Sequence, residues 1–188
     1  FFRYAGARDW SDPHREKLLD ANAALLSAFA AGYLHTGDEA YSETAAGLVD
    51  FLTGTLWAGD GFAACQTPAR EAYYRLEPSE RADRERPGID TTVLADRNGL
   101  AAEALLEYYA YTDAGQAREY GIRTLEHLRE TLIENGTVKR YDDPDAPAGL
   151  LLDQARVCRG FTTAAQVVDP AHVDTASAVA DRAIESLR

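Results

Sequence analysis

The sequence predicts an all-α protein built from repeated helical hairpins. Apolar residues recur at the three- and four-residue spacing of helices in six separate stretches. Three times, a stretch that is apolar on most sides is followed by a short turn and then by an amphipathic stretch. Because one αα-hairpin is repeated, we expect a solenoid or a closed toroid.

The first hairpin is predicted over residues 12–58. Asp12 followed by Pro13 is typical of an N-cap and a first helical residue, so the first helix is expected to begin there. Its apolar residues lie on most sides, which predicts a buried helix: Leu18, Leu19, Leu25, Leu26, Phe29 and Tyr33. After a turn at 36–38, the next stretch has a narrower apolar stripe and is expected to be half exposed.

The second hairpin is predicted over residues 90–134. Its first helix, at 94–112, is apolar and rich in alanine and tyrosine, and its second helix, at 117–133, is amphipathic. This order is the same as in the first hairpin, which supports the reading of a repeat.

The third hairpin is predicted over residues 149–188. A largely apolar helix is expected at 150–168, and Asp169 with Pro170 is expected to cap the last helix. We therefore expect a single domain with three hairpins.

The segments between the hairpins differ from the helices in composition. Residues 59–66 and 135–141 contain glycine and alternating apolar residues, which predicts small strands or turns. Residues 66–89 are strongly charged and contain Pro78, which predicts a loop with one short helical turn. In a toroid of hairpins such connections gather on one face and surround a cleft.

The composition excludes several classes of partner. The 188 residues carry a formal net charge of -12, which argues against nucleic acid and anionic membranes as partners. The longest apolar run, residues 23–34, is too short to span a bilayer. An acidic, lysine-poor chain predicts a halophile's protein, the alternative being an ordinary acidic bacterial protein. Because no Met is present, we expect a processed product or a piece of a longer chain.

The two cysteines predict a reducing compartment. Cys65 and Cys158 lie far apart, without a CxxC pair or histidines at zinc spacing. We therefore expect a cytoplasmic protein that uses no metal or other cofactor. The sequence also contains no P-loop, GxGxxG, HExxH or GxSxG motif, so it gives no argument for phosphoryl transfer, nicotinamide chemistry, zinc proteolysis or serine hydrolysis.

Five segments together resemble one known family. They are FFRYAGARDWSDPHREKLLDANA at 1–23, DGFAACQ at 60–66, EAYYRLEPSE at 71–80, DTTVLADRNGLAAEALLEYYA at 90–110 and GLLLDQA at 149–155. In content and order they resemble the YyaL family of thioredoxin-domain-containing proteins, which includes an animal spermatogenesis-associated member. The sequence departs from the family pattern at Arg15 and Arg97, where the family has aromatic residues.

The resemblance implies a partial (α/α)6 toroid. The family is expected to have a thioredoxin-like domain followed by a toroid similar to six-hairpin glycosidases and N-acylglucosamine 2-epimerases. This sequence contains three hairpins, about half of such a ring, and no thioredoxin-like part. The exposed flanks of a half ring are expected to form a homodimer, or to associate with the remaining toroid or thioredoxin-like part.

Sugar epimerases and isomerases of this class need a base and a second group that returns the proton. His14 is the candidate base, and Glu16 or Asp20 is its candidate charge partner or second acid. On one helix Glu16 and Asp20 would share a face, with His14 in the entrance turn. The alternative is that His14 is an imidazole bonded to a nearby carboxylate, and that the two acids form a solvated face.

Five further residues are candidates for substrate binding. Trp10 and Tyr74 could stack on a sugar ring or simply pack the loop face. Asn22 and Asn98, at matching places in the first two inner helices, could bind sugar hydroxyls or tie hairpins together. Asp153 starts the third inner helix and could also cap it.

Two functions therefore stay open from the sequence. The first is a carbohydrate-active toroid fragment of the epimerase, isomerase or glycosidase type, which binds a sugar-like small molecule. The second is a non-catalytic helical module that mediates assembly.

Overall fold

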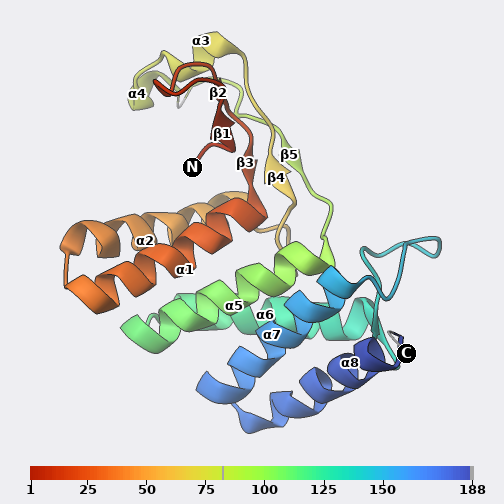
Figure 1. The fold of residues 1–188 in the computed structure, drawn as a ribbon. Coiled ribbons are helices and arrows are strands. Elements are labelled where there is room, and N and C mark those ends of the chain that lie inside the picture. Colours follow the sequence, from red (N-terminus) through yellow and green to blue (C-terminus); the bar gives the residue numbers. More distant parts are fainter. Residues whose placement is uncertain (82, 187–188) are drawn as a thin grey trace.

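The structure, a computed structural model, describes residues 1–81 and 83–186. Its body consists of long helices paired as hairpins (Figure 1). The pairs are α1 (Leu19–Thr36) with α2 (Glu39–Phe51), α5 (Ala95–Thr112) with α6 (Gly115–Thr131), and α7 (Leu151–Val167) with α8 (Val173–Ser186). The expected all-α partial toroid is confirmed.

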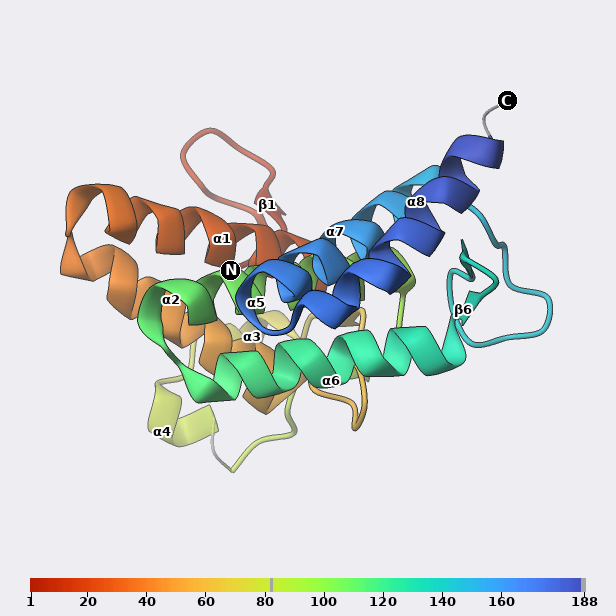
Figure 2. The ribbon, with the colours of Figure 1, turned by 90° about the horizontal axis from the view of Figure 1, so that it is seen from below.

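The first helix of each hairpin lies in an inner row. In this row α5 packs between α1 and α7, and the N-terminal ends of the three helices lie at the same end of the molecule. Each of α2, α6 and α8 packs against its own inner partner and forms an outer layer (Figure 2). α2 continues through a π-helical turn at Leu52–Leu56.

Two apolar clusters form the core, one on each side of α5. Leu105 belongs to the cluster between α1, α2 and α5, and Leu106 to the one between α5, α6, α7 and α8. α5 and α7 approach closely at Gly99, where an added Cβ would lie 2.8 Å from the carbonyl oxygen of Arg156. The absence of a side chain at Gly99 therefore sets the spacing of two inner helices.

The predicted starts of two helices have different outcomes. Asp169 accepts a hydrogen bond from the Ala171 amide at 2.9 Å and caps a short 3-10 turn, Pro170–His172, that leads into α8. The prediction that the first helix begins at Asp12 is wrong, because α1 begins at Leu19. Asp12 adopts a φ of 53°, and its carbonyl accepts a hydrogen bond from the Gly6 amide. The chain therefore forms a β-hairpin there instead of a helix.

Short strands occupy the connections, as expected. β1 (Tyr4–Ala5) pairs with β2 (Pro13–His14), and β4 (Cys65–Gln66) pairs with both β3 (Lys17–Leu18) and β5 (Ile89–Asp90). The segment expected as a charged loop contains two short helices, α3 (Glu71–Tyr74) and α4 (Pro78–Arg81). A further hairpin joins β6 (Ile133–Glu134) to β7 (Thr137–Val138).

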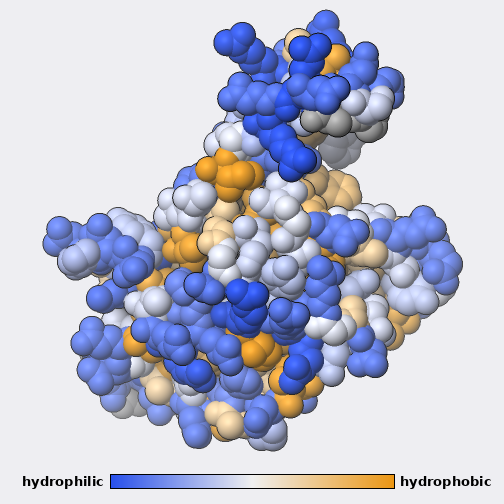
Figure 3. Space-filling model, turned by 180° about the vertical axis from the view of Figure 1, so that it is seen from behind, coloured by the Kyte–Doolittle hydropathy of each residue, from blue (hydrophilic) through white to orange (hydrophobic). Residues whose placement is uncertain are grey.

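The described residues of 1–18 and 65–90 form one projection, which we call the head. It stands at the end of the molecule where α1 and α5 begin (Figure 1). Seen from behind, this projection is largely hydrophilic (Figure 3). The head therefore borders the N-terminal end of the inner row.

Candidate functional site

The three predicted catalytic residues do not form one site. His14 lies in β2, where its exposed ring stacks on Tyr4 with ring centroids 4.0 Å apart. Glu16 pairs with Arg3 at 2.9 Å and precedes the helix. Asp20 lies in the first turn of α1 and lines a different cavity from His14. The prediction that Glu16 and Asp20 share a helix face is wrong, because α1 begins only at Leu19.

Asn98 joins α5 to the segment that follows the first hairpin through backbone hydrogen bonds. Its fully buried amide accepts from the Phe62 nitrogen at 2.7 Å and donates to the carbonyls of Phe62 and Leu94, both at 3.0 Å. Each polar atom of this side chain thus has a backbone partner. Of the two roles considered for Asn98, the geometry supports the tie between hairpins.

Asn22 makes the same kind of contact in the first hairpin. Its amide oxygen accepts from the Phe1 nitrogen at 2.7 Å, and its nitrogen donates to the carbonyls of Phe1 at 3.2 Å and Leu18 at 2.8 Å. The segment before α1 therefore docks on α1 as the segment at Phe62 docks on α5.

Gln154 completes this pattern and was missed from the sequence. Its amide accepts from the Val138 nitrogen at 2.6 Å and donates to the carbonyls of Gly136 and Val179, both at 3.0 Å. A signal was present, since Asn22, Asn98 and Gln154 are each the fourth residue of an inner helix. Unequal connections hide this repeat in the linear sequence.

A cavity of about 270 Å³ lies at the N-terminal ends of the inner helices. Its lining comes from all three of them: Asp20, Ala21 and Ala24 of α1, Asp96 and Leu100 of α5, and Leu152 and Arg156 of α7. Within the described part of the chain, Oδ1 of both Asp20 and Asp96 is buried without a hydrogen-bond partner. Two carboxylates and one guanidinium therefore face a cavity with acceptor capacity unused.

Of the predicted residues, this cavity contains Asp20 but neither of its expected partners. Asp96 and Arg156 were not selected as site residues from the sequence. The signal for Asp96 is its position, because Asp20 and Asp96 are both the second residue of an inner helix. Arg156 carries no local signal and becomes a candidate only through the packing of α7 on α5.

The polar face continues along α5 beyond the cavity. Asp96, Glu103 and Glu107 recur at helical spacing, on the side of α5 opposite buried Leu105. Arg159 of α7 donates to Glu103, and Ser27 of α1 donates to Glu107 at 2.7 Å. Charged and hydroxyl groups thus line the inner side of the row.

Burial changes the acidity of one carboxyl on this face. Glu103 is almost fully buried, and burial raises its pKa above the usual value, while the guanidinium of Arg159 opposes this shift. Its Oε2 has no hydrogen-bond partner among the described residues. Glu103 can therefore hold a proton at a higher pH than an exposed glutamate can.

Asp153 lies inside the protein, in the first turn of α7. It is fully buried, and its Oδ1 lies 3.5 Å from a guanidinium nitrogen of Arg140. Burial, followed by the charge of Asp96, raises the pKa of the Asp153 carboxyl. Leu150 is the N-cap residue of α7 and the helix has no side-chain cap there, so Asp153 does not act as the expected cap.

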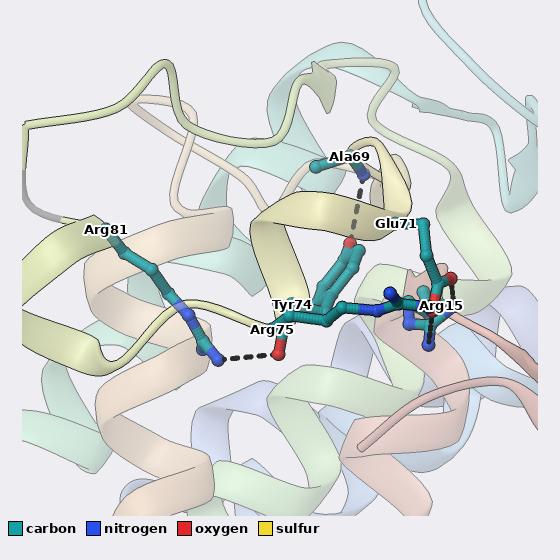
Figure 4. A network of polar contacts seen from close by, with 6 residues as sticks. All are labelled: Arg15, Ala69, Glu71, Tyr74, Arg75 and Arg81. Carbon is teal, nitrogen blue, oxygen red and sulfur yellow. Dashed lines mark hydrogen bonds and ion pairs between the residues drawn. The ribbon is translucent and has the colours of Figure 1, made fainter.

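The two aromatic residues predicted to stack on a sugar ring lie in the head, and they differ in exposure and in contacts. Trp10 is 83% exposed at the turn between β1 and β2. Tyr74 is engaged: its hydroxyl accepts from the Ala69 amide at 3.0 Å, and the Arg15 guanidinium lies 4.9 Å from its ring centre. Arg15 also pairs with Glu71 at 2.6 Å (Figure 4). Tyr74 therefore packs the head.

The described residues bear on two further features, a metal site and a membrane-spanning helix. Across 1–81 and 83–186, no group of three or more His, Cys, Asp or Glu side chains is arranged to hold a metal ion. Over the same residues, every helix is too short or too polar to cross a bilayer.

The fold and its polar inner face define a partial α/α toroid, and solved structures share this architecture. Cellobiose 2-epimerase from Spirochaeta thermophila aligns with a TM-score of 0.70 and 18% identity, covering 87% of this chain and 42% of that protein. A D-mannose isomerase aligns with a TM-score of 0.70 and 15% identity over 89% and 40% of the two chains. A family 76 mannosidase from Bacteroides thetaiotaomicron aligns with a TM-score of 0.67 and 14% identity over 91% and 45%.

Sequence comparison gives a more specific relationship: the chain is homologous to spermatogenesis-associated protein 20, a YyaL-like protein. The human protein is 28% identical over 133 residues, covering 61% of this chain and 16% of that protein. The mouse protein is 31% identical over 83 residues, covering 44% and 10%. The chain thus spans less than a fifth of these relatives and under half of the solved toroids. No family model matches the sequence.

Proposed function

We propose that the inner face of the helical row binds a polyhydroxylated, sugar-like ligand, and that the chain forms this part of a carbohydrate-active toroid. The observation that carries the proposal is the cavity lined by Asp20, Asp96 and Arg156. The carboxylate and guanidinium groups of these lining residues are suited to hydrogen bonds with sugar hydroxyls. The solved neighbours, which include epimerases, isomerases and glycosidases, support the same class of ligand.

The chemistry proposed for this face is proton transfer. Epimerisation and isomerisation need a base and a group that returns the proton, and glycoside cleavage needs two carboxyl groups. Asp20 and Asp96 supply two carboxyl groups to one cavity, and Arg156 supplies a positive charge beside them. In this proposal Asp20 keeps its predicted role, with Asp96 as its partner in place of His14 or Glu16.

Ligand binding tests the proposal directly. The 188-residue chain is screened by thermal shift against mono- and disaccharides, in molar salt because the chain is strongly acidic. A ligand at 100 times its dissociation constant adds about 2.7 kcal/mol to the free energy of unfolding. Asp96→Asn should remove the shift, whereas Asp174→Asn, an exposed first-turn acid of α8, should keep it. No shift with any sugar, or equal loss in both variants, would contradict the proposal.

A second candidate function is an assembly module, and the exposed apolar residues of the third hairpin favour it. Leu150, Leu151 and Leu152 are 41%, 58% and 54% exposed, and Val173 and Ile184 are also exposed. Exposed apolar side chains that gather into a large patch often mark protein interfaces. Light scattering at high salt separates the alternatives: a dimer without sugar binding favours assembly, whereas sugar binding by a monomer favours the first function.

A further inference from the structure

A larger cavity lies in the head, away from the inner face. It has a volume of about 710 Å³ and is lined by residues within 68–76 and 84–88. Three arginines contribute to its lining, Arg70, Arg84 and Arg86, together with one acid, Glu85. The cavity therefore collects positive charge in a chain whose formal net charge is -12.

The arginines of the cavity differ from neighbouring arginines in their contacts. Arg15 and Arg75 both pair with Glu71, and Arg81 donates to the backbone carbonyl of Tyr74 at 3.1 Å. By contrast, Arg70, Arg84 and Arg86 make no ion pair with any described residue. Their guanidinium groups are thus available to an external anion.

Structural contacts hold the walls of this cavity in place. Thr67 donates to the carbonyl of Gly88 at 2.8 Å, which joins the two ends of the segment. The rings of Tyr73 and Tyr74 pack edge to face, with their centroids 5.4 Å apart. The guanidinium of Arg81 lies 5.5 Å from the centre of the Tyr73 ring. Tyr73 and Leu76 add apolar side chains to the lining of the cavity.

We infer that this cavity binds a small molecule that carries a phosphate group. Its volume lies in the range of small-molecule sites, which are mostly apolar with a few placed polar groups. Arginine is favoured for phosphate because its planar group donates two parallel hydrogen bonds. The apolar side chains of Tyr73 and Leu76 leave room for an organic part beside the phosphate. This site is separate from the proposed sugar site.

Calorimetric titration at low salt tests the inference with three probes: glucose 6-phosphate, inorganic phosphate and glucose. Both phosphates should bind, and the comparison between them shows whether the organic part contributes. The double variant Arg84→Gln/Arg86→Gln should weaken phosphate binding about tenfold or more for each arginine removed. Added salt should weaken binding further, because the site is open to solvent.

Arg118→Gln/Arg129→Gln, which removes two exposed arginines of α6, is the charge-matched control and should leave phosphate binding unchanged. Asp96→Asn should also leave it unchanged, so failure of the sugar site and of this site are distinguishable. Any glucose binding should not respond to the Arg84 and Arg86 substitutions. Absence of binding by both phosphates, or equal weakening in the control, would overturn the inference.

Discussion

The helical body and the head differ in how their charge is arranged. The head, residues 1–18 and 65–90, contains nine basic and nine acidic residues, whereas the rest of the chain contains 10 basic and 22 acidic residues. The whole negative excess therefore lies outside the head. The net charge alone would suggest that the negative excess is spread evenly over the molecule, but it is confined to the helical body.

The two regions also differ in what holds them together. Two clusters of buried residues stabilise the body, while no described residue of the head is fully buried. The head depends on short strands, ion pairs and contacts between arginines and aromatic rings. Because few buried apolar contacts mean low local stability, the head should open more readily than the body.

The largest effect is expected from a core substitution in the body. Phe161 of α7 is fully buried in the apolar cluster formed by α5, α6, α7 and α8, so Phe161→Ala should reduce the free energy of unfolding by about 3–5 kcal/mol. Tyr73→Ala, in the head, should cost far less because Tyr73 is only partly buried. Urea unfolding measures both variants. Similar losses would contradict the contrast between the regions.

A smaller loss is expected where two inner helices touch. Gly99→Ala places a Cβ against the backbone of Arg156 and Val157, and overpacking of this kind costs about 1–3 kcal/mol. Gly47→Ala is the matched control, since nothing lies within 4 Å of its Cβ position on exposed α2. That variant should gain about 0.5–1 kcal/mol from helix propensity. Thermal unfolding distinguishes a loss from a gain.

The buried amide ties predict a third effect within the body. Asn98→Ala leaves the Phe62 amide and carbonyl without their partner, which costs about 1–3 kcal/mol for a buried polar group. Asn22→Ala removes the equivalent contact to Phe1, which is partly exposed, so it should cost less. Urea unfolding compares the two. Equal losses would show that the ties do not depend on burial.

The helices of the body could be predicted from the sequence because their periodicity is local. The exact start of α1 could not, because the residues at 12–14 pair with residues at 4–6 through contacts that no helical pattern encodes. The candidate site shows the same contrast between local patterns and packing. Asp20 was selected as a partner of His14, which lies elsewhere, and its actual neighbours Asp96 and Arg156 depend on how three helices pack.

The pH dependence of stability tests the buried acid of the body. Burial raises the pKa of the Asp153 carboxyl above its ordinary value, so the folded state binds this proton more tightly than the unfolded chain does. The free energy of unfolding should therefore fall as pH rises through the folded pKa. Asp153→Asn removes this contribution, so the stability of the variant relative to the unsubstituted protein should increase as the pH rises above the ordinary titration range of an aspartate.

The smallest global effect is expected from an ion pair of the head. Glu71→Gln removes the pairs with Arg15 and Arg75, and because Glu71 is half exposed the cost should be about 0–1 kcal/mol. Hydrogen exchange should nevertheless speed up in the head, because these contacts replace the buried core that it lacks, while amides of α5 and α7 keep their protection. Glu119→Gln, which removes an exposed pair on α6, is the control and should leave exchange in the head unchanged. Faster exchange in α5 after Glu71→Gln would show that the head and body unfold as one unit.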